Sequence, residues 1–395
     1  MKKILIFSLE FPPMVGGAGT YSYELAKGLV NTGNQVTVLT LNCGQFKKVE
    51  VNKVDNELNA LGIQIIRKLW INKIWFIYWP FLLKRFLRAN EFDLLVVANE
   101  GGHIVASHLN KNTLKNYIVV FHGGEDIKFF GSITPHSLIQ FSKSRMYSYC
   151  ENSSKIISVS EYLKNQFDKC GFSSEKMEIV HNGIDISFFK PMPENESHKV
   201  RNTFLIKNNY KGSPKIILCS SRLAYLKGQD VVIKSFKRII DIGHDSILII
   251  AGDGAERGNL EELVDKLELT NKVIFTGNIS RYALLTLYQI CDLFVMISSL
   301  NETFGIVYIE AMACRKPVIG SNIAAVPEVI KDGKTGLLVN PYSIDECTES
   351  INKILTNVNL ADTLAKNAYK KVINEFSVEI MARNTVSGLF KKIVR

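Results

Sequence analysis

Short hydrophobic runs alternate with segments of helical pattern along the first half of the chain. An apolar run over 3–9 is followed by a glycine-containing loop, a helix is predicted over 21–31, and a second β-rich run covers 34–41. Further runs of β-branched and aromatic residues lie at 92–99, 116–124 and 155–160. Strands that alternate with helices in this way predict a parallel, doubly wound sheet.

The same alternation stops and then restarts half-way along the chain. Prolines and polar residues replace the periodic pattern at 188–200, which is typical of a linker. Beyond it, buried strands are predicted at 214–223, 246–254, 272–279, 292–299 and 317–322, and helices at 229–241, 258–268, 281–291 and after Gly305. The fold class predicted is α/β, with two Rossmann-like doubly wound parallel-sheet domains that face each other across a cleft.

Length supports this division, because 395 residues exceed what one hydrophobic core usually holds together. We expect an N-terminal Rossmann-like domain at 1–190, a linker at 191–199 and a C-terminal Rossmann-like domain at 200–375. The remaining residues, 376–395, are predicted to form a helix, and no further strand is predicted for it to pack against. Packing back on the N-terminal domain is one fate for that helix.

Composition excludes several classes of protein. The seven cysteines are scattered and never spaced as Cys-x-x-Cys, which favours reduced thiols in a cytoplasmic protein over disulfides or a zinc site. Glu10 interrupts the first apolar run, so this run is interpreted as a strand and not as a signal peptide. The net charge is +10, but no nucleic-acid-binding motif accompanies the basic residues, and no nucleic-acid partner is expected.

One segment, 67–90, concentrates the basic charge beside aromatic residues. It contains six Lys or Arg, no acidic residue and all three tryptophans. Its apolar run is about half the ~20 residues needed to span a bilayer. Two interpretations are open: a peripheral contact with the inner face of the plasma membrane, or a core helix whose basic edge reaches solvent.

Two carboxylates, Glu302 and Glu310, flank a Thr-Phe-Gly turn that follows the strand at 292–299. A helix that starts at this turn directs free amides toward the crevice where open α/β sheets bind ligands, and its dipole attracts phosphate. At helical rise, eight residues span ~12 Å, about the separation of the two sugars in a nucleotide-sugar folded around its diphosphate. The two carboxylates are therefore candidates for binding one set of hydroxyls each.

Two cations and two glycines extend this candidate site. Arg222 and Lys227 follow the strand at 214–223 and can reach one diphosphate, the arginine as a fork and the lysine as a point charge. Gly16 and Gly17 let the backbone approach a ligand closely. They do not form the dinucleotide-binding fingerprint, because the third glycine is out of register.

These motifs together resemble those of the retaining GT-B glycosyltransferases of family 4, also described as glycosyl transferases group 1. The resemblance covers nearly the whole chain through an ordered set of motifs: FPPMVGGAGTYSYELAKGL, FHGGED, HNGID, SSRLAYLKGQD, AGDG, FTGNIS and ETFGIVYIEAMACRKPVIGSNIAAVPEVI. It implies the GT-B fold and an enzyme that transfers a hexose from a nucleotide-diphosphate sugar.

The resemblance also implies roles for individual residues. Glu302 would contact the hydroxyls of the transferred sugar, Glu310 would bind the donor ribose, and Arg222 with Lys227 would clamp the diphosphate. The implied donor contacts also include the backbone amides of Phe304, Gly305 and Ile306. Gly16 and Gly17 would close over the diphosphate, and His122 would line the reaction centre.

The mechanism implied is metal-independent transfer with retention. The chain has no Asp-x-Asp sequence, so Arg222, Lys227 and helix amides would meet the donor charge, with no metal or other cofactor. The expected donor is GDP-hexose or UDP-hexose, with mannose, glucose, galactose or N-acetylhexosamine as the sugar. The expected acceptor is a glycan or lipid-linked oligosaccharide in cell-surface polysaccharide or lipopolysaccharide synthesis.

Three alternatives remain open at this point. A glycosyltransferase with a small soluble acceptor would share every donor motif and differ in the first domain. A nucleotide-sugar epimerase of the same architecture would consume donor without an acceptor. A non-catalytic glycan- or nucleotide-binding protein would bind nucleotide tightly and turn nothing over.

Overall fold

The computed structural model describes residues 1–14, 16–42, 48–69, 75–123, 137–172, 175–299 and 302–390. Asn301, residues 70–74 of the basic segment and 124–126 of the FHGGED motif lie outside these ranges. The chain divides into two compact units, one formed by Met1–Asp185 with Ser377–Arg395 and the other by Ile186–Phe376. Each unit has its own sheet and its own hydrophobic core.

The first unit is built on a seven-stranded parallel sheet. Its strands are β1 Lys3–Phe7, β2 Gln35–Leu41, β3 Ile63–Lys68, β4 Leu94–Val97, β5 Tyr117–Phe121, β6 Lys155–Ser158 and β7 Met177–Ile179. They lie in the order β3-β2-β1-β4-β5-β6-β7, so the chain winds outward from β1 to one edge and then returns to β4 and winds to the other. The doubly wound sheet predicted from the sequence is confirmed for this unit.

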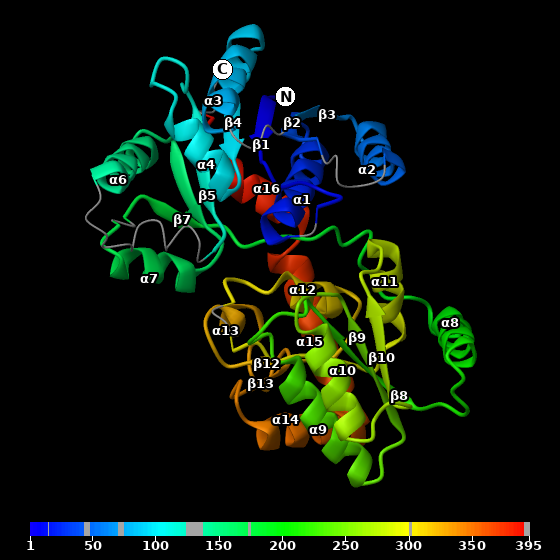
Figure 1. The fold of residues 1–395 in the computed structure, drawn as a ribbon. Coiled ribbons are helices and arrows are strands. Elements are labelled where there is room, and N and C mark those ends of the chain that lie inside the picture. The colour runs from blue at the N-terminus through cyan, green and yellow to red at the C-terminus, as the bar shows by residue number, and fades with distance from the viewer. Residues whose placement is uncertain are drawn as a thin grey trace. The chain divides into compact units, whose positions relative to one another are not determined.

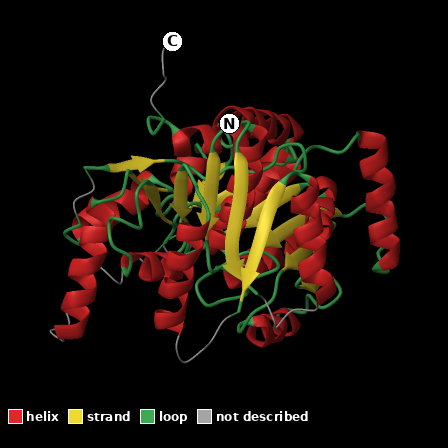
Figure 2. Ribbon diagram, turned by 90° about the horizontal axis from the view of Figure 1, so that it is seen from above, coloured by secondary structure: helices red, strands yellow, loops and turns green. Residues whose placement is uncertain are grey.

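Helices cover both faces of the sheets, as the red coils beside the yellow strands show (Figure 2). In the first unit they are α1 Gly17–Asn31, α2 Lys48–Ala60, α3 Trp75–Ala89, α4 Glu100–Ser107, α6 Ser137–Glu151, α7 Glu161–Lys169 and α16 Val378–Val386. The central strands β1, β4 and β5 are almost entirely buried apolar residues, as a parallel sheet covered on both faces requires.

The last described helix, α16, belongs to the first unit although it follows the second in sequence. It packs against α1, where the red and blue ribbons lie side by side (Figure 1). Val378, Met381 and Ala382 are completely or almost completely buried in the same core as β1 and β4. The buried ammonium of Lys155 donates to the carbonyl oxygens of Asn384 and Ser387, which fixes the end of this segment.

The second unit repeats the architecture with six parallel strands. These are β8 Lys215–Ser220, β9 Ser246–Ala251, β10 Val273–Gly277, β11 Leu293–Met296, β12 Val318–Ser321 and β13 Leu337–Val339, in the order β10-β9-β8-β11-β12-β13. Its helices are α8 Glu194–Lys207, α9 Gln229–Asp241, α10 Arg257–Lys266, α11 Arg281–Ile290, α12 Ile306–Ala313, α13 Val326–Val329, α14 Ile344–Thr356 and α15 Val358–Glu375. The winding direction reverses between β8 and β11, which is where open α/β sheets bind their ligands.

Helix α8 begins inside the range interpreted from the sequence as a linker. Pro191 and Pro193 end the extended connection, and Glu194 and Glu196 lie in the first turn of the helix, where acidic side chains complement the helix dipole. Arg201 of α8 pairs with Asp292 at 2.8 Å. The polar residues at 194–199 are therefore the start of a surface helix of the second unit and not an irregular connector.

Candidate active site

An ion pair joins the carboxyl ends of β8 and β11, where the winding of the second sheet reverses. Lys227 follows β8 and Glu302 follows β11, and the Lys227 Nζ atom lies 2.7 Å from Glu302 Oε2. The two side chains are only 22% and 17% exposed, respectively. A cation and a carboxylate predicted separately as donor-binding groups are thus in direct contact.

The loop that carries Lys227 is fixed to the end of β11 by backbone contacts. The Ser299 amide donates to the Leu226 carbonyl oxygen at 2.9 Å. Gly228 adopts a φ of 75°, and a Cβ at this position would lie 1.7 Å from the Ile297 carbonyl oxygen. Only glycine fits where these two backbone segments cross so closely. The crossing therefore fixes the backbone position of the neighbouring residue, Lys227.

Arg222 stands at the exposed side of the same loop. Its carbonyl oxygen accepts a hydrogen bond from Gln229 Nε2 at 3.1 Å, which holds the backbone. Within the described ranges, its guanidinium makes no hydrogen bond and no ion pair. The structure therefore brings Lys227 and Glu302 together and leaves the Arg222 fork available to an anion.

Helix α12 starts at the Thr-Phe-Gly turn that follows Glu302, as the sequence predicted. Gly305 is its N-cap with a φ of 90°, Ile306 is its first residue, and Phe304 is buried with its ring edge-on to Phe376 at 5.6 Å. The first amides of a helix lack intrahelical partners, so this turn is suited to an anionic ligand. The Glu302 carbonyl oxygen accepts from the Ala325 amide at 3.1 Å, which ties the turn to the segment before α13.

Glu310 lies one turn into α12 and is only 7% exposed. Its Oε2 atom accepts a hydrogen bond from the Tyr288 hydroxyl at 3.0 Å. Burial and the Glu310 carboxylate raise the pKa of Tyr288 well above its usual value, so the phenol stays protonated and donates. Tyr288 thereby orients the carboxylate predicted to bind ribose.

The predicted separation of the two glutamates needs one correction. The ~12 Å figure applied helical rise to all eight residues. Helix α12 begins only at Ile306, so Glu302 precedes it in a non-helical turn. Because the turn need not follow the helix axis, the helical rise does not give the distance between these two carboxylates.

In the first unit, the predicted glycines lie where β1 leads into α1. Helix α1 begins at Gly17, four positions before the predicted start, so Gly16 is the N-cap and Gly17 opens the first turn. The Glu10 carboxylate accepts from the Gly19 amide at 3.2 Å. A Cβ on Gly16 would lie 1.6 Å from Glu10 Oε1, so the glycine makes room for this carboxylate.

His122 follows β5 at the same edge of the first sheet. Its ring lies edge-on to the buried ring of Tyr21, with 4.4 Å between the centroids. Burial lowers the pKa of His122 to about 3, although a hydrogen bond to the Ala98 backbone acts in the opposite direction. The imidazole is therefore neutral at pH 7, so it can contact a ligand as a polar group but does not supply a positive charge.

No cluster of three or more His, Cys, Asp or Glu side chains suited to a metal ion occurs in the described part of the chain. The six cysteines within those ranges are free thiols. Among the helices that the structure describes, none is long and apolar enough to cross a bilayer.

Two family descriptions match the chain, one for each unit. "Glycosyltransferase Family 4" matches residues 15–188, and "Glycosyl transferases group 1" matches residues 200–371. The chain belongs to the family 4 glycosyltransferases of group 1. The enzyme is therefore a glycosyltransferase, as the motifs implied.

Relatives and solved structures agree with this membership. The glycosyltransferase is 27% identical to the N-acetyl-alpha-D-glucosaminyl L-malate synthase of Bacillus anthracis, covering 93% of this chain and 92% of that one. It is 23% identical to a GDP-mannose-dependent alpha-(1-6)-phosphatidylinositol monomannoside mannosyltransferase of Mycolicibacterium smegmatis, covering 90% and 89%. HepE of Anabaena, solved with UDP and glucose, superposes with a TM-score of 0.78 at 22% identity, covering 98% and 99%, and shows that the fold is GT-B.

Two residues of this glycosyltransferase were not identified as site residues from the sequence. Tyr288 lies in α11 as one aromatic of an apolar helical face, and nothing in the spacing connects it with Glu310. Glu10 was noted only because it interrupts an apolar run. Its position between a strand and a glycine loop, nine residues before the amide it binds, was the signal that could have found it.

Proposed function

We propose that the protein is a retaining, metal-independent hexosyltransferase that uses a GDP-hexose or UDP-hexose donor. The contact between Lys227 and Glu302 beside the first turn of α12 carries this proposal, because it places a cation, a carboxylate and free amides at one ligand-binding edge. Arg222 adds a second cation, and Tyr288 orients Glu310 for a ribose hydroxyl. In the first unit, Gly16, Gly17 and His122 are proposed as further ligand contacts.

The proposed reaction breaks the bond between the anomeric carbon and the diphosphate oxygen. Lys227, Arg222 and the amides of Phe304, Gly305 and Ile306 stabilise the negative charge on the departing diphosphate. Glu302 holds the sugar hydroxyls while the anomeric carbon gains oxocarbenium character. The acceptor oxygen forms the new bond from the same face, and its proton passes to the leaving phosphate oxygen.

Thermal-shift titration with UDP, GDP and ADP and their hexose conjugates, without metal, tests the donor site. A ligand that binds only the folded state at 100 times its Kd stabilises it by about 2.7 kcal/mol. We expect one nucleotide series to raise the Tm of the wild type and to lose this effect in Glu310→Ala. If no nucleotide raises the Tm, the donor site assigned here is wrong.

Lys227→Ala tests the charge on the leaving group. Loss of one preorganised donor to a transition-state anion lowers kcat by about 10²–10³-fold. Lys234→Ala is the matched control, because this lysine makes an exposed pair with Asp230 on the next helix. Equal activity of the two variants would contradict the role of Lys227.

Treatment with EDTA tests the metal-free mechanism. Loss of activity with EDTA that magnesium restores would contradict it.

For the acceptor, we propose a lipid-linked glycan in cell-surface polysaccharide or lipopolysaccharide synthesis, reached from the cytoplasmic face of the membrane. Helix α3 supports this: Trp79 and Leu83 are fully buried, and Phe7 contacts Trp79, whereas Ile77 and Phe81 are 63% and 64% exposed. Arg85 and Arg88 follow on the exposed side, a pattern typical of surface-lying membrane helices. The buried Trp79 belongs to the core, and the membrane contact is proposed for the exposed side of the helix alone. The mycobacterial relative is named for a phosphatidylinositol-linked acceptor.

Sedimentation with anionic liposomes at low salt tests this face. The Phe81→Glu variant is expected to lower the lipid partition coefficient at least tenfold, because burying a phenylalanine contributes about 1.5–3 kcal/mol. Ile206→Glu, at a 73% exposed position of α8, is the control and is expected to bind like the wild type. A wild-type protein that stays in the supernatant would refute the membrane contact.

A small soluble acceptor is the second candidate. The Bacillus relative, whose name specifies malate, supports it. Full transfer activity toward a soluble acceptor, unchanged by liposomes and by Phe81→Glu, would favour this candidate. Conversion of donor without any acceptor would instead indicate an epimerase.

A further inference from the structure

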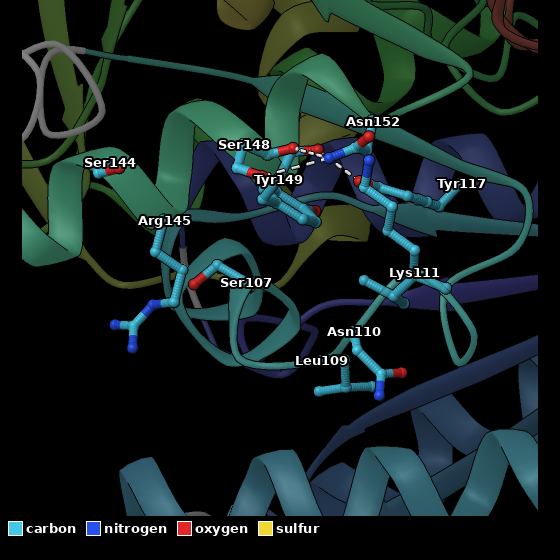
Figure 3. A pocket seen from close by; sticks show the side chains of 11 residues that line it. Ser107, Leu109, Asn110, Lys111, Tyr117, Ser144, Arg145, Ser148, Tyr149 and Asn152 are labelled. Atoms are coloured by element: carbon cyan, nitrogen blue, oxygen red, sulfur yellow. Dashed lines mark hydrogen bonds between the residues drawn. The ribbon is translucent and has the colours of Figure 1, made fainter.

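The cavity in the first unit lies away from the edge of the sheet that carries the candidate site. It is lined by the end of α4, by the segment before β5 and by one side of α6, and its cations Lys111 and Arg145 point apart (Figure 3). This is the amino edge of the sheet, whereas Gly16, Gly17 and His122 follow carboxyl ends of its strands. The loops at the carboxyl edge, and the side chains that hold them, therefore decide what the first unit presents to a ligand.

Arg67 is buried at this carboxyl edge, although it opens the basic segment 67–90. It is the last residue but one of β3 and lies opposite Thr40 of β2 in the sheet. Its side chain is only 8% exposed. The charge of Arg67 therefore acts inside the first unit and is not part of the exposed side of α3.

The Arg67 guanidinium joins three parts of the first unit. Its Nη2 and Nε atoms donate to the Asp55 carboxylate of α2, at 2.7 Å to Oδ1 and 3.0 Å to Oδ2. Its Nη1 atom donates to the Leu41 carbonyl oxygen at the end of β2, at 3.2 Å. Nη2 also donates to the Pro12 carbonyl oxygen at 2.6 Å. The carboxylate balances the buried positive charge, and the same fork holds two backbone carbonyls.

Pro12 belongs to the glycine loop, the segment 11–17 that joins β1 to α1. A proline has no N–H, so its carbonyl oxygen is the only backbone group through which a hydrogen bond can hold it. The Arg67 guanidinium also lies over the ring of Phe11, 5.8 Å from the centroid, which is within the range of a cation–π contact. Arg67 thus contacts two successive residues of the glycine loop and ties them to α2 and β2.

The shape of arginine is what makes this link. Its planar fork carries five N–H donors in fixed directions, so it binds the Asp55 carboxylate and the Pro12 carbonyl oxygen at the same time. A lysine carries a single nitrogen on a flexible chain, which can neutralise Asp55 but does not reproduce the fork. Arg67→Lys therefore keeps the charge of the pair and removes the fixed link from the pair to the glycine loop.

We propose that Arg67 is a positioning residue for the transfer reaction, which holds the glycine loop through Pro12 so that Gly16 and Gly17 meet the ligand. This inference rests on the proposed function, in which these two glycines are ligand contacts. A displacement of about 1 Å at a reacting site can lower the rate about 10²-fold. Loss of the link is therefore expected to lower kcat, whereas nucleotide binding, assigned to the second unit, is expected to change little.

Kinetics of two complementary variants test the proposal. In Arg67→Lys, kcat is expected to fall at least tenfold, whereas the Kd for UDP or GDP, measured by titration calorimetry, stays within threefold of the wild type. Asp55→Asn keeps the fork and an acceptor oxygen but removes the negative charge, so it is expected to lose stability and to retain kcat per folded molecule. A wild-type kcat in Arg67→Lys, or an equal loss of kcat in both variants, would overturn the proposal.

Arg201 of α8 provides a matched control in the second unit. It pairs with Asp292 and donates to the carbonyl oxygens of Pro214 at 2.6 Å and Ile290 at 3.0 Å, so it also joins a carboxylate, a proline and a second carbonyl. Pro214 precedes β8 and Ile290 lies before β11, which places these contacts at the amino edge of the second sheet. Arg201→Lys is expected to lose stability but to keep kcat. A fall in kcat as large as that of Arg67→Lys would overturn the positioning role.

Hydrogen exchange reads the state of the glycine loop without any measurement of catalysis. The Met14 amide donates to the Phe11 carbonyl oxygen at 3.2 Å within this loop. This amide is expected to exchange at least tenfold faster in Arg67→Lys and at the wild-type rate in Arg201→Lys. Unchanged exchange in Arg67→Lys would overturn the proposal whatever happens to kcat. A wild type that binds no nucleotide would instead contradict the proposed function, so the two can fail separately.

Discussion

Single residues of the second unit show why the candidate site has little tolerance for substitution. Gly305 is required by two independent features, a φ of 90° and the ring of Tyr308, which lies where a Cβ would be. The Tyr308 hydroxyl donates to the Met296 carbonyl oxygen at 2.6 Å, so this ring cannot easily move aside. The start of α12 is therefore fixed by the last residue of β11.

Gly305→Ala is expected to destabilise the protein by about 2 kcal/mol, because a non-glycine residue at this φ is strained and its Cβ would approach the Tyr308 ring at 2.6 Å. Gly258→Ala in α10 is the matched control: nothing lies within 4 Å of its Cβ, and about 0.5–1 kcal/mol of stabilisation is expected from helix propensity. Urea unfolding of both variants measures the difference. Equal effects would show that the turn before α12 adapts.

In the first unit, Glu10 fixes the start of helix α1, as Gly305 fixes the start of α12 in the second. Its carboxylate accepts from the Gly19 amide in the first turn of α1, where no side chain of the N-cap residue does so. Glu10→Ala is expected to lower the free energy of unfolding by about 0.5–2 kcal/mol, the usual effect of removing a helix cap. Glu10→Gln keeps an acceptor oxygen and should recover most of this loss. A Gln variant as unstable as the Ala variant would show that charge, not the hydrogen bond, is what matters.

At the scale of elements, the pattern of buried positions predicted the central strands and the helices between them. The range 229–241 matches α9, whose core-facing side is formed by residues such as Val232, Phe236 and Ile239. The edge strand β10 was predicted, at 272–279, whereas the edge strands β3, β7 and β13 were not. Only Ile63 of β3 is buried, and β7 has three residues, so neither carries the apolar run that marks a buried strand.

The candidate site, like the fold, was predictable only in part from the sequence. Glu302, Lys227 and Gly305 could be proposed from motifs because each lies in a loop that follows a predicted strand. The contact of Tyr288 with Glu310 joins α11 to α12 across 22 positions and depends on how both helices pack. The start of α1 was misplaced because glycines have low helix propensity, whereas in the structure the Glu10 carboxylate stabilises this turn from outside the helix.

Helix α4 gives an element-scale prediction about pH. His103 is buried against β5, where its Nε2 lies 2.9 Å from the Val120 carbonyl oxygen, and burial lowers its pKa to about 4. The folded state therefore binds fewer protons than the unfolded state between pH 4 and 6.5, and stability is lost as the pH falls through this window. From pH 7 to 5 the loss from this one residue is about 2 kcal/mol.

Urea unfolding at pH 7, 6 and 5 checks this effect. The dependence on pH is expected to be shallower in His103→Asn than in the wild type, whatever the stability of the variant at pH 7. His122, whose pKa is also lowered, retains part of the slope in that variant. Parallel curves for the two proteins would exclude His103 as a source of the pH dependence.

At the scale of the whole molecule, the chain passes from the first unit to the second and then returns. The two crossings lie after Asp185 and after Phe376. The backbone segments beside them pair with each other. Ile184 and Ser377 form a β-bridge, and the Val378 amide donates to the Ile184 carbonyl oxygen at 3.1 Å. A Cβ on Gly183 would lie 2.5 Å from the Ser377 carbonyl oxygen. This close pairing makes the returning segment part of the first unit.

This return of the chain has a consequence for biosynthesis. The second unit is continuous in sequence, whereas the first lacks Val378, Met381 and Ala382 of its core until the whole second unit has been synthesised. Domains usually fold in order from the N-terminus during synthesis. Here the second unit can complete its core before the first unit does. A chain truncated after Phe376 is expected to keep residues 186–376 resistant to protease while 1–185 is digested; digestion of both parts at one rate would contradict this order.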